Sequence, residues 1–106
     1  TGIWLLNFQA GAARQNGQDL KGTFFDIQET TNNSSFSTAS RGIVKHDGFG
    51  EFGTTSCSFI FDVTNTSNDK IRTLQNEQQG NASNINILGN SGLTITGISF
   101  IRLADT

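Results

Sequence analysis

The sequence of 106 residues contains no proline, methionine or tyrosine, and only one cysteine, one tryptophan and one histidine. One cysteine excludes an internal disulfide framework and a zinc site built from several cysteines. Seven Lys and Arg stand against nine Asp and Glu without a basic run, so neither nucleic acid nor an anionic membrane surface is an expected partner. No apolar stretch approaches the roughly 18–20 residues of a membrane-spanning helix, so membrane insertion is not expected.

Apolar residues are also scarce, at 34% of the chain, whereas about two fifths of the residues are Asn, Gln, Ser or Thr. A domain of this length buries only about 60–65% of its unfolded surface, so its core is marginal when it stands alone. We therefore expect a single domain over residues 1–106 that partner subunits stabilise. A small monomer with a modest core is the alternative. Because the chain has no starting methionine, we expect it to be the C-terminal part of a longer chain.

The apolar runs are rich in Phe, Ile, Val and Thr, which favour strands, and no window has a sustained helical period. Polar clusters that favour turns separate these runs. In the fourth run, Cys57, Phe59, Phe61 and Val63 share one face, and Cys57 is expected to be a small buried hydrophobic residue. The predicted strands cover residues 2–9, 19–29, 36–45, 54–63, 70–78, 84–88 and 93–104. Short strands at this spacing predict an all-β antiparallel sandwich or barrel.

Two of these runs, residues 3–8 and 93–103, are apolar on both faces. Such strands are expected where both faces of a sheet are covered. We therefore predict an inner sheet that contains these two runs together with residues 71–75.

No group of residues predicts catalysis, a metal or a cofactor. His46 lies beside Asp47 in a glycine-rich connection, where an exposed loop histidine is favoured over a catalytic base. His46, Asp47 and Glu51 could together hold a hard cation, but an ordinary solvated loop is preferred. Residues 48–53 match the dinucleotide fingerprint formally, yet a strand rather than a helix follows them. We therefore expect that the protein is not an enzyme.

Any ligand site is expected in exposed loops, because loops carry binding on rigid β scaffolds. The loops at residues 13–18, 30–35 and 46–51 offer amide, hydroxyl and guanidinium groups that suit sugar hydroxyls. The alternative is that these groups only satisfy their own turns. The candidate ligand-binding residues are Arg14, Gln15, Asn16, Gln18, Asn32, Asn33, His46 and Asp47.

Three segments carry a family resemblance. They are the Gly-plus-aromatic strand TGIWLLNFQA at residues 1–10, the hairpin from Phe59 to Gly80, and the closing run SGLTITGISFIRLADT at residues 91–106. Together they resemble the tumour necrosis factor-like jelly-roll superfamily, which includes the globular heads of complement-type collagenous proteins. The resemblance implies an antiparallel jelly-roll sandwich. Members of the superfamily have further strands before the position matched by Gly2, so this chain is expected to lack the first strands.

Domains of this type, with similar compositions, also occur at phage tail-fibre tips, as viral surface knobs and as capsid decoration proteins. The uncharged polar composition and the lack of disulfides fit that setting. The resemblance therefore implies a non-enzymatic module of the virion surface that acts in host attachment or capsid decoration. Its expected partners are other virion proteins, or a glycan or protein of the host surface. The alternative is an extracellular complement-like recognition domain that binds glycan or protein ligands.

The closing strand predicts an oligomer interface. If one face of this strand fills the core, the other face would expose Ile98 and Phe100 to water, which requires a partner. Closed symmetry buries such a patch without forming fibres, and the family resemblance implies a homotrimer. Arg102 is expected to meet Asp105 or Glu77 of a neighbouring subunit. The predicted interface residues are Gln75, Thr94, Thr96, Ile98, Phe100 and Arg102.

Overall fold

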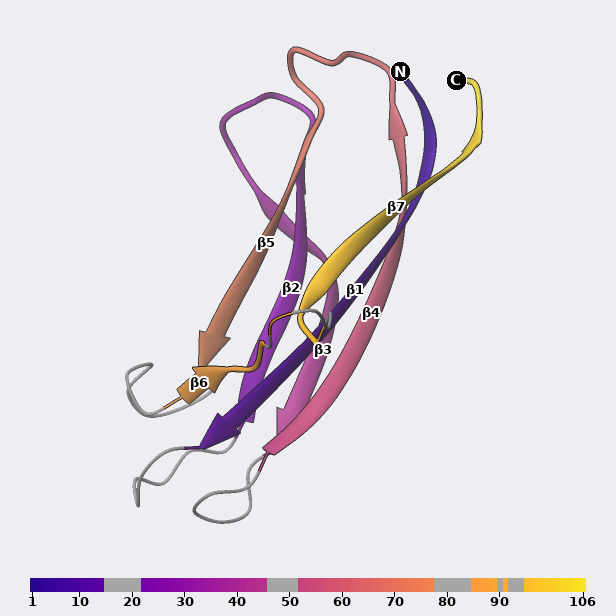
Figure 1. The fold of residues 1–106 in the computed structure, drawn as a ribbon. Helices are drawn as coiled ribbons and strands as arrows, with labels where there is room; N and C mark the ends of the chain where they lie inside the picture. The colour runs from indigo at the N-terminus through magenta and orange to yellow at the C-terminus, as the bar shows by residue number, and fades with distance from the viewer. Residues whose placement is uncertain (15–21, 46–51, 78–84, 90, 92–94) are drawn as a thin grey trace.

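The computed structural model describes residues 1–14, 22–45, 52–77, 85–89, 91 and 95–106, and these residues form two antiparallel sheets that pack face to face (Figure 1). The strands are β1 (Gly2–Arg14), β2 (Gly22–Thr30), β3 (Ser37–Lys45), β4 (Phe52–Val63), β5 (Lys70–Glu77), β6 (Ile85–Ile87) and β7 (Gly97–Ala104). Each of them overlaps a strand predicted from the sequence. The expected all-β antiparallel sandwich is therefore confirmed.

The first sheet is built around β1. Strand β4 pairs with β1 along almost its whole length, from Gly2 opposite Val63 to Ala13 opposite Phe52. On the other side of β1, β7 pairs with residues 3–9 and β6 pairs with residues 12–14. The two short strands β6 and β7 therefore lie one after the other along the same side of β1. The sheet contains four strands but is only three strands wide.

The second sheet has the order β3-β2-β5. The prediction that residues 71–75 share a sheet with the first and last apolar runs is therefore wrong, because β5 pairs with β2 in the opposite layer. The alternation of side chains along β5 places Ile71 on the face towards the core. It does not specify which strand pairs with β5. Polar contacts of the outer face, such as Arg72 Nε donating to Gln28 Oε1 at 2.7 Å, hold β5 beside β2.

Strand β1 is longer than the sequence predicted. The stretch after Gln9 was expected to be a loop, because alanine has little preference for strands. In the structure the strand continues to Arg14, and Ala10 and Ala12 are completely buried. Their small side chains lie on the core face, and the opposite face of β1 is covered as well, since a Cβ on Gly11 would lie 3.1 Å from Leu88 Cδ1. Tertiary packing thus extends the strand through a segment of weak local preference.

The core lies between the two sheets, and it takes alternate residues from each central strand. Phe8 and Phe25 meet edge to face, with ring centroids 6.0 Å apart, and so join the two layers. Cys57 packs against this core but is only partly buried, not fully buried as predicted, and its Sγ lies 3.7 Å from the carbonyl oxygen of Phe25. The buried apolar residues are Leu6, Phe8, Ala10, Ala12, Phe25, Ile27, Val44 and Phe61.

The two long sides of the sandwich differ. On one side β3 and β4 pack closely, and a Cβ added to Gly42 would lie only 2.7 Å from Thr55 Oγ1. On the other side two hollows separate β5 from β7, and we call this side, between β5 and β7, the open side. The chain termini lie together at one end of the molecule, where Arg102 Nη2 donates to the carbonyl oxygen of Thr1 (Figure 1).

Candidate functional site

The open side contains an apolar hollow. This first hollow has a volume of about 280 Å³ and lies between the inner faces of β1, β4 and β7 and the start of β5. Its wall is mostly apolar, so a ligand or partner that fills it would exclude water rather than form many hydrogen bonds. The lining residues are Trp4, Leu6, Phe61, Val63, Asp69, Ile71 and Phe100.

A second hollow of about 260 Å³ lies further along the open side, and it too is mainly apolar. Ile98 and Thr96 form its wall from the segment of β7, and residues 73–75 form its wall from β5. Phe8 and Phe25, from the two central strands, form its floor. The two hollows therefore follow one another along the strand direction, which makes the open side a continuous apolar groove.

The core of the sandwich reaches the surface in this groove. Leu6 and Phe25 at the floor are only 1% and 2% exposed. At the rim, Phe100 is 54% exposed and Ile87 is 44% exposed. Exposed apolar side chains that lie next to a buried core form a contiguous patch, and such a patch marks an interaction surface.

Among the described residues, Asp69 is the one charged residue that lines the two hollows. Its carboxylate belongs to the turn between β4 and β5, where it accepts hydrogen bonds from the backbone N–H groups of Asn65 and Thr64 at 2.7 and 2.8 Å. These bonds, the one from Asn65 foremost, lower the pKa of Asp69 below its usual value. The groove itself therefore presents a nearly uncharged surface that suits an apolar partner.

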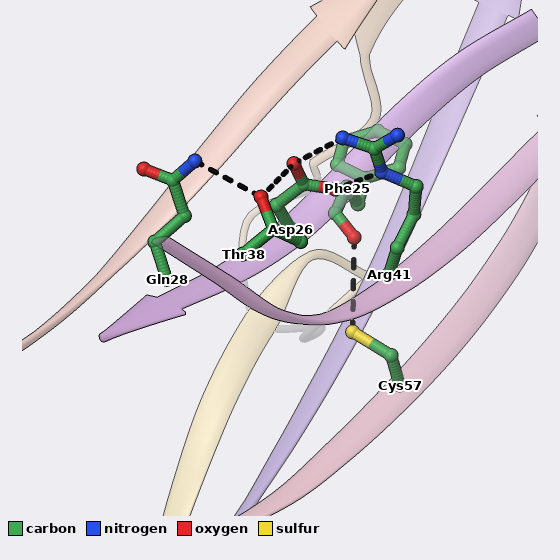
Figure 2. Close-up of polar contacts among 6 residues, drawn as sticks. All are labelled: Phe25, Asp26, Gln28, Thr38, Arg41 and Cys57. Atoms are coloured by element: carbon green, nitrogen blue, oxygen red, sulfur yellow. Dashed lines mark hydrogen bonds and ion pairs between the residues drawn. The ribbon is translucent and has the colours of Figure 1, made fainter. Parts of the chain in front are cut away.

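A different arrangement crosses the outer face of the second sheet, and Figure 2 shows most of it. Arg41 on β3 donates from Nε and Nη2 to the two carboxylate oxygens of Asp26 on β2, at 2.6 and 2.7 Å. Thr38 Oγ1 donates to Asp26 at 3.1 Å and accepts from Gln28 Nε2 at 3.1 Å. Arg72 on β5 donates to the other end of Gln28. We call these five residues the polar ladder, and it connects all three strands of the sheet.

The polar ladder contains a buried charge. Asp26 is only 1% exposed, and the hydrogen bonds from the Arg41 guanidinium lower the pKa of its carboxyl group, with smaller contributions from Thr38 and the positive charge of Arg41. Burial works in the opposite direction. The same ion pair raises the pKa of Arg41.

Both arginines of the ladder also stack on phenylalanine rings. The Arg41 guanidinium lies 4.3 Å from the ring centre of Phe24, and the Arg72 guanidinium lies 4.1 Å from that of Phe36. The contacts of Arg72 with Gln28 and Phe36 add to the backbone pairing of β5 with β2, and so they help to position one wall of the open side. We therefore assign the ladder a structural role.

The predicted loop site is only partly within the described residues. Asn32 Oδ1 accepts hydrogen bonds from the backbone N–H groups of Ser34 and Ser35, so its amide oxygen is occupied within its own turn, which is the alternative that the sequence left open. Asn33 has a positive φ of 60°, and its N–H donates to the carbonyl oxygen of Asn68 in the neighbouring turn. Outside the described residues lie Gln15, Asn16, Gln18, His46, Asp47 and the side chain of Arg14.

Most of the predicted interface residues lie on the open side. Gln75, Thr96, Ile98 and Phe100 all line its hollows. Ile98 nevertheless packs against the core, so the expectation that this face of the closing strand points away from the core is wrong at that position. Arg102 pairs with Asp105 of its own chain, and its contact with a neighbouring subunit stays a prediction. Thr94 lies outside the described residues.

Sequence reasoning missed the polar ladder, and it located the groove only in part, through the interface residues predicted on the closing strand and at Gln75. The ladder left a signal in β2, where Asp26 and Gln28 alternate with the apolar residues Phe25 and Ile27. A carboxylate in so apolar a strand needs a cationic partner, and Arg41 in the next predicted strand was available. The sequence did not predict that these residues line one groove between the two sheets, because that depends on which strands form the edges of the sheets.

Among the described residues, no three His, Cys, Asp or Glu side chains come together in a way that could hold a metal ion. The same part of the chain contains no helix long and apolar enough to span a membrane. Comparisons of the whole chain with protein-family models, curated proteins and solved structures found no match.

Proposed function

We propose that this protein is a non-enzymatic module of a virion surface, which acts in host attachment or capsid decoration and assembles as a homotrimer through its open side. The observation that carries this proposal is the apolar groove between β5 and β7, where exposed apolar side chains lie next to the buried core. A neighbouring subunit that covers the groove would remove this apolar surface from water. The gain is about 25 cal/mol for each Å² that is buried.

The path of the chain between the sheets supports the jelly-roll part of the proposal. The connections from β1 to β2, from β3 to β4, from β4 to β5 and from β5 to β6 each pass from one sheet to the other. Among the described strands, β2 and β3 form the one antiparallel pair of neighbours along the chain. Repeated crossing of this kind is typical of Greek-key and jelly-roll sandwiches.

The edges of the sheets agree with the expectation that the first strands of the jelly roll are missing. Within the described residues, no strand lies beyond β5 in its sheet or beyond β7 in the other. Both of these edges belong to the open side. Two more strands there would close this long side of the sandwich and cover the groove.

The position of the chain on virus particles tests this proposal. We would label purified particles of its source with a gold-conjugated antibody against the chain and locate the gold by electron microscopy. Gold at fibre tips would support host attachment, and gold on the shell would support decoration. Particles without the chain would contradict the proposal. Gly-X-Y repeats encoded upstream would then favour the alternative, an extracellular complement-like recognition domain.

A further inference from the structure

Building on the proposed homotrimer, we infer that a second copy of this chain covers the open side by pairing an extended strand with the free edge of β7. The first sheet would then continue from one subunit into the next. This contact differs from simple packing of side chains against side chains, because backbone hydrogen bonds cross the subunit boundary.

The edge of β7 has the features of a strand that accepts another strand. Among the described strands β7 pairs only with β1, so one row of its backbone N–H and C=O groups has no strand opposite. All residues from Ser99 to Ala104 are exposed. Proteins usually protect such an edge with proline, with several charges or with a central bulge. Here Arg102 is the one charged residue, and the register shift lies near the far end of the strand, between Ile3 and Trp4 of β1.

The edges formed by β3 and β4 pack against each other on the closed side of the sandwich, and the edge formed by β5 carries Lys70, Arg72 and Glu77. β3 also carries Arg41 and Lys45 along its length. β7 has apolar side chains on both faces instead. Phe100 faces the groove, while Ile101 and Leu103, on the outer face, are 49% and 51% exposed. A strand added beside β7 could therefore make apolar contacts on both faces at once.

The spacing of the two hollows also fits an extended strand. On β7, Phe100 lines the first hollow and Ile98 lines the second, two residues away. Two residues of a strand span about 7 Å, and side chains at positions i and i+2 point to the same face. A strand alongside β7 would therefore direct successive same-face side chains into the two hollows.

A second copy is a suitable source for this strand on electrostatic grounds. Each chain carries a net charge of −2, so copies repel one another weakly except where a contact is free of charge. Within the described part of the chain, Asp69 is the one charged residue that lines the groove, and its carboxylate already accepts hydrogen bonds within its own turn. A head-to-tail contact that closes after three subunits leaves no β7 edge open for fibre growth.

Amide hydrogen exchange followed by NMR at single-residue resolution tests this inference. We would compare the chain at a concentration where light scattering shows the trimer with the same chain diluted until it dissociates. Strand addition predicts that alternate amides of residues 97–104, those pointing away from β1, exchange at least about tenfold more slowly in the trimer. The outward-pointing amides of β3 serve as the internal control, and their exchange should be equal in both states.

The outcomes separate this inference from the proposed function. A trimer in which the outward amides of β7 exchange as fast as in the dissociated chain would overturn the strand pairing and leave the trimer standing. A chain that stays monomeric at all concentrations would overturn both proposals. Protection that requires a different added protein would show that the strand comes from a foreign partner, which also overturns the inference. Because dilution dissociates the unchanged chain, the test does not require a variant that could fail to fold.

Discussion

At the scale of single residues, the account depends most on Asp26. Its carboxylate is buried, and Arg41 and Thr38 provide three hydrogen bonds to it. Removing the Asp26 carboxylate leaves the donors of Arg41 and Thr38 without their acceptor. The resulting loss of stability exceeds the net contribution of the intact hydrogen bonds. The polar ladder therefore stabilises the second sheet only as a complete set.

Asp26→Asn should lower the free energy of unfolding by about 1.5–3 kcal/mol, the range for hydrogen bonds to charged groups. The amide keeps the size of the side chain but removes the charge and one acceptor. Urea denaturation followed by tryptophan fluorescence of Trp4 measures the change. The control is Asp62→Asn, since Asp62 is exposed and should tolerate the amide within about 0.5 kcal/mol. Equal stability of both variants would contradict the role of the ladder.

The stability of the protein should also depend on acid pH. The folded pKa of Asp26 lies below its usual value of 3.8, so its contribution is complete above that value. The contribution disappears as the pH falls from about 3.8 through the lower folded pKa. Asp69 has the same sign of shift. Unfolding measured between pH 6 and pH 2 should therefore show a fall in stability below about pH 4.

In the same pH series, Asp26→Asn and Asp69→Asn should each make the acid-dependent fall shallower, because each removes one carboxyl group whose pKa is lowered on folding. A combined variant should be the flattest of the three. If Asp26→Asn kept the full slope of the natural sequence, the carboxylate would not be linked to folding as the hydrogen bonds indicate.

Individual residues also show where sequence reasoning reached its limit. Asn32 was a candidate for binding because its amide suits sugar hydroxyls, and its sequence context could not show that the turn uses the oxygen internally. Ile98 and Phe100 share a face in sequence, yet Ile98 packs on the core and Phe100 is half exposed. The difference in burial between these two side chains depends on how far the second sheet extends over β7. The alternation of residues along a strand does not predict this.

At the scale of strands, the sequence predicted which segments are extended but not how they pair. Local composition and polar turn clusters located each strand, because these signals act over a few residues. The assignment of β5 to the wrong sheet shows the limit. Its neighbour β2 is chosen by long-range contacts, such as that of Arg72 with Gln28. The end of β1 was missed for a similar reason, since burial of Ala10 and Ala12 overrides their weak strand preference.

The close approach of β3 and β4 gives a prediction at this scale. Gly42→Ala should destabilise the protein by about 1–3 kcal/mol, the usual cost of overpacking. The new Cβ would lie 2.7 Å from Oγ1 and 2.8 Å from Cγ2 of Thr55. Thermal unfolding followed by circular dichroism measures the loss. Gly89→Ala is the matched control, because a Cβ there meets nothing within 4 Å.

A second substitution distinguishes this steric clash from a general effect of alanine in a strand. Thr55→Ala removes both atoms that the new Cβ meets, so it should restore much of the stability lost in Gly42→Ala. The two changes would then be non-additive, as expected for residues in contact. Strictly additive losses would show that the closed side of the sandwich is not packed as tightly as described.

At the scale of the whole molecule, the two long sides of the sandwich have different roles. The closed side holds the sheets together through β3 and β4, whereas the open side leaves an apolar groove beside the unprotected edge of β7. Composition alone indicated a marginal core and a need for partners. The pairing of the strands places the exposed apolar surface on the open side, between β5 and β7.

The central claim is that the open side is buried between copies of this chain, and multi-angle light scattering at micromolar concentration tests it most directly. The account predicts a mass about three times the 11.4 kDa of one chain. Phe100→Asp should dissociate the trimer, because a carboxylate at the rim of the groove cannot be buried without a partner. Phe52→Asp, at a ring that is 76% exposed and lines neither hollow, should leave the trimer intact. A stable monomer near 11.4 kDa, or a trimer that Phe100→Asp does not affect, would contradict the claim.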